Sequence, residues 1–262
     1  MLRQQRHDRI LDVVKQRKVC SINDLREELG VSQVTIYRDL KELQRENMVS
    51  RVHGGVSVAE VGPIESRFTI RLESEREAKE AIGRYEAEKV REGWAIFVDA
   101  STTCYVFAKA LAGRGLSRVT LVTNSPQIPL EMQNLPQIQV ISTGGELQHQ
   151  LNAFAGPMAL NQLTSLHFDA AYLSAAGISA SHGMTTDSPL LAEILRTVAA
   201  KSQRTNILVD HTKFFRRGLI TGLGIGQASR VITDSQVSDE IAEEFKAAGT
   251  KLEVVSTVSD SK

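Results

Sequence analysis

Residues 32–43 combine a helical pattern with side chains that can bind DNA. Ile36, Leu40 and Leu43 recur at i, i+4 and i+7, so they would lie on one face of a helix. The opposite face carries polar and basic side chains, namely Gln33, Thr35, Arg38 and Lys41. Short side chains, amides and a guanidinium can read base edges in a major groove, and a lysine can contact phosphate. An ordinary amphipathic helix with a solvated face has the same pattern, so the neighbouring segments decide between the two readings.

Helix-capping residues indicate two helix starts in this region. Ser21 and Asp24 fit a capping box, although Asp stands where Glu or Gln is usual. Gly30 can take the left-handed conformation that ends a helix. Ser32 can then accept hydrogen bonds from the backbone N–H groups in the first turn of the following helix. Together with a first helix over 3–16, these signals predict a helix-turn-helix, whose last helix is presented to DNA.

A short hairpin is predicted directly after these helices. Valines mark the segments 49–52 and 56–58, and Gly54 with the glycine after it can take the positive φ values of a tight turn. Helices followed by such a hairpin form a winged helix. Arg51 and His53 would lie on the wing, where they suit contact with phosphate or with the minor groove.

Small polar side chains follow several apolar runs later in the chain. The run 94–98 is followed by Asp99, Ser101, Thr102 and Thr103 and then by a helical stretch. Hydroxyl groups and backbone N–H groups at a helix N-terminus can bind phosphate. Loops after later runs add Thr123, Asn124, Gly144, Gly145, Glu146, Asp210 and Lys213. Each loop taken alone also fits helix capping or a turn, so the prediction of a ligand site depends on their meeting at one place.

An α/β fold is predicted for this second part of the chain. Apolar runs alternate with helical segments, which indicates a largely parallel sheet. We expect the strands at 94–98, 119–123, 138–141, 170–173, 206–209, 231–233 and 252–255. Ligands in such sheets bind outside the carboxyl ends of the strands, which is where the polar loops lie.

The segment between the two parts is interpreted as a linker. Residues 59–74 contain Gly62 and Pro63 and carry mixed charge, which is typical of a connection between domains. A long charged helix is expected from Glu73 to Arg91.

Composition permits DNA binding and indicates a soluble protein in a reducing compartment. Residues 1–58 hold 11 Lys or Arg and 8 Asp or Glu, so the N-terminal part is mildly basic although the whole chain has zero formal charge. The two cysteines are far apart, so no disulfide framework or metal site is expected. No apolar run approaches the roughly 20 residues that span a bilayer. A charged N-terminus does not fit a signal peptide, so we expect a cytoplasmic protein without membrane contact.

Two further side chains near the polar loops each fit two different roles. Cys104 lies at a helix start, where a thiol pKa can be lowered, but a small buried thiol is the expected reading. His211 follows Asp210 and could meet a ligand or make a structural hydrogen bond.

The N-terminal motifs resemble those of the DeoR family of bacterial transcriptional regulators. The matching residues are Arg6, the run 31–40, Leu43 and the run 51–55, with Tyr37 standing where the family commonly has the first of two arginines. The resemblance implies a DNA-binding domain over 1–58, with its helix-turn-helix at about 20–39. The implied and inferred DNA-binding residues are Ser21, Ser32, Gln33, Thr35, Tyr37, Arg38, Lys41, Arg51, His53 and Gly54.

Residues from about 75 to 235 resemble the sensor domain of the same family. This resemblance implies an effector-sensing and oligomerisation domain over 75–258, similar in fold to ribose-5-phosphate isomerase and to CoA-transferase-type domains. It further implies that Ser101, Thr102 and Thr103 hold a phosphate and that Lys213 neutralises charge. By the same resemblance, the other pocket residues would be Asp99, Thr123, Asn124, Gly144, Gly145, Glu146 and Asp210.

The function that follows is sequence-specific regulation of transcription. We expect a repressor of a carbohydrate or nucleoside operon that binds double-stranded operator DNA as a dimer or tetramer and is relieved by a phosphorylated sugar or a related metabolite. No catalytic residue, cofactor or metal is predicted. Two alternatives stay open: a sugar-phosphate isomerase-like enzyme with a DNA-binding appendage, and a transcriptional activator.

Overall fold

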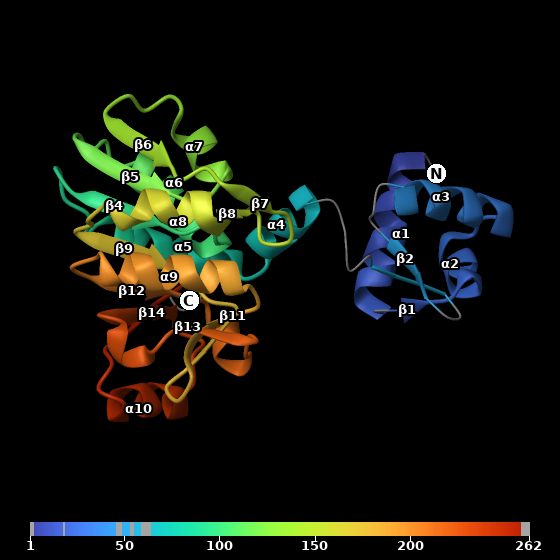
Figure 1. The fold of residues 1–262 in the computed structure, drawn as a ribbon. Coiled ribbons are helices and arrows are strands. Elements are labelled where there is room, and N and C mark those ends of the chain that lie inside the picture. The colour runs from blue at the N-terminus through green and yellow to red at the C-terminus, as the bar shows by residue number, and fades with distance from the viewer. Residues whose placement is uncertain (1–2, 18, 46–48, 53–54, 59–63, 258–262) are drawn as a thin grey trace. The chain divides into compact units, whose positions relative to one another are not determined.

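A computed structural model describes residues 3–17, 19–45, 49–52, 55–58 and 64–257 of the 262-residue chain (Figure 1). The chain divides into two compact units, residues 1–70 and residues 71–262. None of the helices in the described ranges has the length and apolar character that crossing a bilayer requires.

The first unit is a winged helix. Its elements are α1 (Arg3–Arg17), β1 (Val19–Cys20), α2 (Ile22–Leu29), α3 (Gln33–Arg45), β2 (Val49–Val52) and β3 (Gly55–Val58). Ile10, Leu25, Ile36, Leu40 and Leu43 are almost fully buried in one core that the three helices and the strands share. The predicted apolar stripe of α3 is therefore confirmed.

The predicted caps form the boundaries of the helix-turn-helix. The Ser21 hydroxyl accepts from the Asp24 backbone N–H at 3.1 Å, and the Asp24 carboxylate accepts from the Ser21 N–H at 3.0 Å. Gly30 ends α2 with φ of 64°, in the left-handed region. The Ser32 hydroxyl accepts from the Thr35 N–H at 3.2 Å, which caps the start of α3.

A two-residue strand between α1 and α2 completes the wing. β1 pairs antiparallel with β3, which pairs in turn with β2, giving the order β1-β3-β2. The Cβ of any other residue at position 55 would lie 2.4 Å from the carbonyl oxygen of Cys20. Only glycine therefore lets these two backbones approach closely enough to pair.

The connection between the units contains a helix, so the predicted helix boundaries are wrong here. α4 (Ile64–Glu73) lies within the segment interpreted as a linker, and α5 (Arg76–Ala87) is shorter than the predicted helix from Glu73 to Arg91. Glu75 separates α4 from α5 with φ of 51°, a left-handed conformation that a continuous helix excludes. The charged residues that were predicted to form a single helix therefore belong to two helices.

The second unit is built on a seven-stranded parallel sheet, which confirms the predicted fold class. The strand order is β15-β14-β12-β9-β4-β5-β6, and every neighbouring pair is parallel. The strands are β4 (Ala95–Val98), β5 (Val119–Thr123), β6 (Ile138–Ser142), β9 (Ala170–Leu173), β12 (Thr205–Leu208), β14 (Arg230–Asp234) and β15 (Leu252–Val255). All seven lie where the apolar runs predicted them, and no end is shifted by more than one residue.

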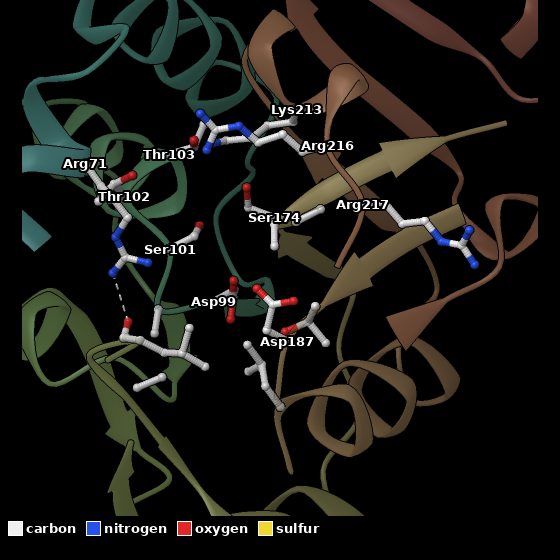
Figure 2. Close-up of a pocket in the computed structure, with 17 residues that line it drawn as sticks. Arg71, Asp99, Ser101, Thr102, Thr103, Ser174, Asp187, Lys213, Arg216 and Arg217 are labelled. Carbon is white, nitrogen blue, oxygen red and sulfur yellow. Dashed lines mark hydrogen bonds between the residues drawn. The ribbon is translucent and has the colours of Figure 1, made fainter. Parts of the chain in front are cut away.

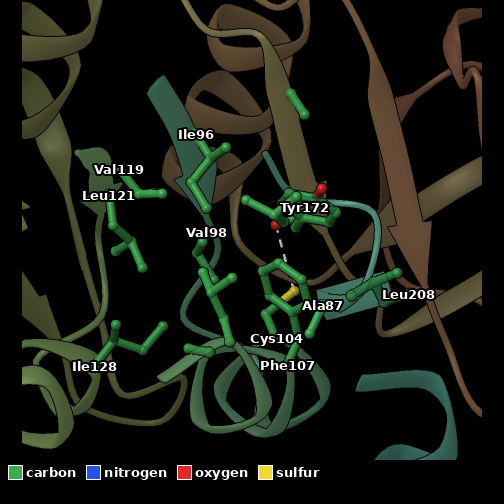
Figure 3. Close-up of a cluster of buried hydrophobic side chains, with 14 of the residues drawn as sticks. Ala87, Ile96, Val98, Cys104, Phe107, Val119, Leu121, Ile128, Tyr172 and Leu208 are labelled. Carbon is green, nitrogen blue, oxygen red and sulfur yellow. Dashed lines mark hydrogen bonds between the residues drawn. The ribbon is translucent and has the colours of Figure 1, made fainter. Parts of the chain in front are cut away.

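Helices cover both faces of this sheet. Alternate strand residues face opposite sides, so Ile96 and Val98 pack in one core and Phe97 packs in the other. The first core lies against α5, α6 (Thr102–Ala112) and α7 (Gln127–Met132), as Figure 3 shows for Phe107 and Ile128. The second core lies against α8 (Gly156–Thr164), α9 (Pro189–Ala200) and α10 (Asp239–Ala247).

Several short elements of the second unit were not predicted. β7 (Glu146–Gln148) and β8 (Ala153–Ala155) form a hairpin. β10 (Gly177–Ser179), β11 (Gly183–Thr186) and β13 (Ile220–Leu223) form a small antiparallel sheet. Two 3-10 turns, η1 (His211–Phe215) and η2 (Ile225–Gln227), follow β12 and β13. These elements border the carboxyl ends of the main strands.

An ion-pair network joins α5 to strands β14 and β15. Glu86 is fully buried and binds Lys89 at 2.7 Å and Arg230 at 2.9 Å. Glu253 binds the same two cations at 2.7 Å and 3.1 Å. Burial raises the pKa of Glu253, but its hydrogen bonds from Lys251 and Lys89 and the charge of Arg230 outweigh that and lower the pKa to about 2.

We predict that Glu253→Gln destabilises the second unit by about 2 kcal/mol at neutral pH, because the variant loses charge-assisted hydrogen bonds. Since the folded pKa of Glu253 lies below the unfolded value, its stabilisation is complete above about pH 4.5 and is lost as pH falls toward 2. The fluorescence of Trp94, the single tryptophan, reports urea unfolding of this unit. The difference between wild type and variant should shrink from pH 7 to pH 3; a constant difference contradicts the prediction.

Candidate functional site

The outer face of α3 presents the side chains predicted to meet DNA. Gln33, Arg38 and Lys41 are exposed, and Tyr37 is 40% exposed. Thr35 is half-buried, and its hydroxyl lies 2.8 Å from that of Ser32. Ser32 and Ser21 both serve as helix caps, so their first role is to position the helices.

A buried carboxylate fixes α3 against α1. Asp39 is 1% exposed and accepts two hydrogen bonds from Arg6, Nε to Oδ2 at 2.5 Å and Nη2 to Oδ1 at 2.9 Å. His7 Nε2 lies 3.3 Å from Oδ1. Burial raises the pKa of Asp39, but the bonds and charge of Arg6 together with His7 outweigh it and lower the pKa. The two-pronged contact sets the angle at which α3 is held.

The wing residues can be placed only in part. Arg51 lies in β2, opposite Val56 of β3. The side chain of Arg51 and the whole of His53 and Gly54 lie outside the described part of the chain. Their predicted contact with DNA stays a prediction.

A cavity of about 450 Å³ opens at the carboxyl end of the parallel sheet (Figure 2). Asp99, Ser101, Thr102 and Thr103 line it after β4, as the sequence predicted. The remaining walls come from α4, the β7–β8 hairpin, the loop after β9, the end of β11, α9 and the segment after β12. They contribute Arg71, Leu151, Ala153, Ser174, Ala175, Ala176, Thr186, Asp187, Leu191, Lys213, Arg216 and Arg217, and Ala100, between Asp99 and Ser101, completes the lining.

Asp99 is the buried acid of this cavity. Its side chain follows β4 and is 3% exposed, and its Oδ1 has no hydrogen-bond partner. Burial raises the pKa of Asp99 to about 6, against the opposing effect of nearby backbone N–H groups of Ala100, Ser174 and Ser101. A buried carboxylate oxygen without a partner on a cavity wall is suited to accept a hydrogen bond from a bound hydroxyl.

The N-terminus of α6 also faces the cavity. Ser101 caps the helix by accepting from the Cys104 backbone N–H at 3.2 Å. Thr102 and Thr103 occupy the first turn and are mostly buried while still lining the cavity. N–H groups of a first turn lack partners within the helix, and the helix dipole favours an anion there.

Four cations line the same cavity as this helix start. Lys213 was predicted from sequence, whereas Arg71, Arg216 and Arg217 were not. Burial lowers the pKa of Lys213 more than the charge of Asp210 raises it, and the positive charges of Arg216 and Arg71 lower it further. Positive charges that repel one another around a helix N-terminus favour binding of an anion.

Other side chains predicted for the pocket do not line this cavity. Thr123 donates to the Val98 carbonyl at 2.6 Å. Asn124 accepts from the Ala100 N–H at 3.1 Å and donates to the Phe154 carbonyl at 3.3 Å. Both are fully buried, so they hold the Asp99 loop in place rather than face a ligand.

Gly144, Gly145, Glu146 and Asp210 also lie outside the lining. A Cβ on Gly145 would approach the Ala155 carbonyl oxygen to 2.7 Å, so this glycine serves the packing of the β7–β8 hairpin. Glu146 is exposed on β7. Asp210 is buried and caps η1 by accepting from the Thr212 N–H at 3.1 Å.

The β7–β8 hairpin explains these placements. In the sheet, β4 separates β5 and β6 on one side from β9 and β12 on the other. The hairpin follows β6 and places Leu151 and Ala153 on the cavity wall, while Phe154 bonds to the backbone and side chain of Asn124. It therefore takes the position that the loops after β5 and β6 were expected to occupy.

Cys104 and His211 have structural environments. Cys104 is fully buried, its Sγ lies 3.3 Å from the Tyr172 carbonyl oxygen, and burial raises the pKa of its thiol (Figure 3). His211 Nδ1 lies 3.0 Å from Asp234 Oδ1. Within the described ranges, no group of three or more His, Cys, Asp or Glu side chains could hold a metal ion.

Two family models together match most of the chain. Residues 6–61 match the DeoR-like helix-turn-helix domain, and residues 74–235 match the DeoR C terminal sensor domain. The first match covers the winged helix, and the second covers most of the unit that contains the cavity.

The chain is similar along most of its length to curated regulators. It is 33% identical over 90% of both chains to the uncharacterized HTH-type transcriptional regulator YulB of Bacillus subtilis. It is 29% identical to the glycerol-3-phosphate regulon repressor of Escherichia coli, over 90% of this chain and 92% of that one. It is 30% identical to the L-fucose operon activator of the same species, over 88% and 95%.

Among solved structures, ribose 5-phosphate isomerase A of Neisseria gonorrhoeae resembles part of the chain. The match covers 52% of each chain at 18% identity, with a TM-score of 0.39.

We predict that Asp39→Ala destabilises the winged helix by about 3 kcal/mol or more, because it leaves Arg6 without its buried partner. Since the folded pKa of Asp39 is lowered, the wild-type contact stabilises the unit above about pH 4 and loses this effect below it. Far-UV circular dichroism should show an earlier transition in the variant, while Trp94 fluorescence, which reports the second unit, should be unchanged. Equal shifts in both signals would argue against a local clamp.

Proposed function

Because the chain belongs to the DeoR family of transcriptional regulators, we propose that it represses a carbohydrate or nucleoside operon until a phosphorylated sugar or related metabolite binds its sensor domain. The observation that carries the effector half is the cavity in which the N-terminus of α6 lies among cations and a buried carboxylate. The DNA half rests on a capped α3 with an exposed polar face.

For DNA binding, we propose that α3 enters the major groove. Gln33 and Arg38 would reach base edges, and Lys41 would contact phosphate. Arg51 of β2 would add a wing contact. Such motifs bind paired half-sites as dimers, so we propose that the chain works as a homo-oligomer, a dimer or tetramer, in the cytoplasm.

For the effector, we propose that its phosphate group binds at the start of α6. Ser101, Thr102 and Thr103 supply hydroxyl and N–H groups, and Lys213 and Arg216 supply positive charge. The predicted roles of Ser101 to Thr103 and of Lys213 are kept in this proposal.

The carbohydrate part would lie toward the acids. In Figure 2 the carboxylates of Asp99 and Asp187 lie toward one end of the cavity, and Lys213 and Arg216 lie toward the other. Carboxylates accept hydrogen bonds from sugar hydroxyl groups, while a second phosphate there would meet like charge. We therefore propose a monophosphate with hydroxyl groups as the effector class.

We propose that the cavity senses its ligand without converting it. A carboxyl group with a pKa of about 6 is also suited to proton transfer, so an isomerase activity is the alternative that Asp99 favours. Formation of a ketose from ribose 5-phosphate by the intact protein would overturn the assignment as a sensor. We propose repression rather than activation. Whether the bound protein represses or activates transcription depends on where the operator lies relative to the promoter.

We predict that Lys41→Ala weakens operator binding by a similar factor for all sequences and reduces the slope of log affinity against log salt by about 1, because one phosphate contact is lost. Arg38→Ala should cost about 1–3 kcal/mol and relax preference at one base position. Fluorescence anisotropy with duplexes that the wild-type protein selects from a random pool measures both. An unchanged salt slope for Lys41→Ala would remove that residue from the DNA contact.

We predict that one phosphorylated sugar raises the thermal stability of the purified protein, whereas its unphosphorylated parent does not. A ligand at 100 times its dissociation constant adds about 2.7 kcal/mol when it binds only the folded state. The panel includes glycerol 3-phosphate, ribose 5-phosphate and L-fucose 1-phosphate with their parents, measured by differential scanning fluorimetry.

Variants separate the phosphate site from general effects on stability. Thr102→Ala and Lys213→Ala line the cavity and should lose the shift. Lys109→Ala, an exposed lysine of α6 outside this cavity, should keep it. A shift that survives both cavity substitutions would place the phosphate elsewhere.

A further inference from the structure

The last turn of α4 forms part of the effector cavity. Arg71 lies on this turn and lines the cavity, and its Nη2 donates to the Leu151 carbonyl at 3.2 Å (Figure 2). Leu151 lies in the β7–β8 hairpin. Arg71 thus connects α4 to the β7–β8 hairpin on the cavity wall.

A buried lysine ties the backbone of the same turn to the second unit. Lys79 of α5 is 2% exposed, and its ammonium group donates to the Arg71 carbonyl at 2.7 Å and to the Ser74 carbonyl. These carbonyls end α4, where a cation also suits the helix dipole. Arg71 is therefore held through both its backbone and its side chain.

The helix continues without a break across the division between the units. α4 runs from Ile64 to Glu73, and the division falls between Ile70 and Arg71. The interruption comes only after the helix, where Glu75 takes its left-handed conformation. Backbone hydrogen bonds link successive turns of α4, so residues 64–70 belong to the same helix as Arg71.

We propose that Arg71 is the residue through which a bound phosphate acts on α4 and so on the DNA-binding unit. The inference rests on the proposed phosphate site. The guanidinium donates to the neutral Leu151 carbonyl, whereas a phosphate offers a charged acceptor and a stronger, bidentate bond. The phosphate therefore draws Arg71 from Leu151 and orders or shifts the turn that carries it.

Charge in the cavity supplies the driving force. Lys79, Lys213 and Arg71 lie close enough for their charges to influence one another, and burial deprives the two lysines of water. Asp210 compensates both lysines in part. An added anion reduces the remaining repulsion most where the cations are least hydrated, which is around the end of α4.

Hydrogen exchange of the full chain tests this with inorganic phosphate as the probe, against chloride at equal ionic strength. In the wild-type protein, saturating phosphate should slow exchange at residues 102–105, where it binds, and by about fivefold or more across 64–73, in line with common coupling energies. Arg71→Gln should keep the effect at 102–105 and lose it across 64–73.

Arg217→Ala is the matched control, because Arg217 lines the same cavity from a different segment. It should need more phosphate and then show the wild-type effect on 64–73 at saturation. Arg71→Lys keeps the positive charge but lacks the planar guanidinium, so it should show an intermediate slowing of exchange across 64–73. This variant replaces Arg71→Gln if Arg71→Gln folds poorly.

The outcomes separate this inference from the proposed function. Protection at 102–105 without protection of α4, or protection of α4 that survives Arg71→Gln, would overturn the role of Arg71 and leave the phosphate site standing. An absence of protection at both segments in wild-type protein would overturn the phosphate site and, with it, this inference.

Discussion

The shared direction of β12, β9 and β4 is the constraint on which the effector cavity depends. Because the three neighbouring strands are parallel, their carboxyl ends meet at one edge of the sheet. That edge brings together Asp99, Ser174 and Lys213, although Asp99 and Lys213 are more than a hundred residues apart in the sequence. It also places the start of α6, directly after β4, beside them. A reversed strand at any of these positions would send its loop to the opposite edge and remove one wall of the cavity.

Two buried aspartates, one in each unit, differ in their hydrogen-bond partners and in the direction of their pKa shifts. Asp39 has a bidentate arginine, so its carboxylate stays ionised and serves to fix a helix. Asp99 has one oxygen without a hydrogen-bond partner, and burial raises its pKa to about 6. A carboxylate that is satisfied by its own chain contributes to stability, whereas one left unsatisfied costs stability that a ligand can return. The contrast identifies Asp39 as a structural contact and supports the proposal that Asp99 meets a ligand.

Signals that act within one helix or strand were interpreted correctly from sequence, as was the parallel sheet, whereas several contacts between distant segments were missed. Ser21, Gly30 and Ser32 act within one turn of their own helix, so residue type was enough to predict them. Asn124 looked like a ligand-binding residue because it follows a strand, but its amide is used by the Ala100 and Phe154 backbones. The hairpin that supplies Phe154 is too short to have a periodicity of its own. Arg71 was missed because it lies in a segment with Gly and Pro that reads as a linker, and only the folded chain brings it to the cavity.

The helical character of α4 changes what kind of coupling is physically available. A flexible linker transmits little more than a tether length, because its residues rearrange independently. A helix whose last turn is bonded to Lys79 and Leu151 links the positions of its residues through the backbone hydrogen bonds. Coupling then requires only that a ligand change the preferred position or order of that one turn, and a differential affinity of about 1–3 kcal/mol is sufficient. One contact that a phosphate would alter is the hydrogen bond from the charged Arg71 guanidinium to the neutral Leu151 carbonyl, and a charge-assisted bond to phosphate is stronger than that one.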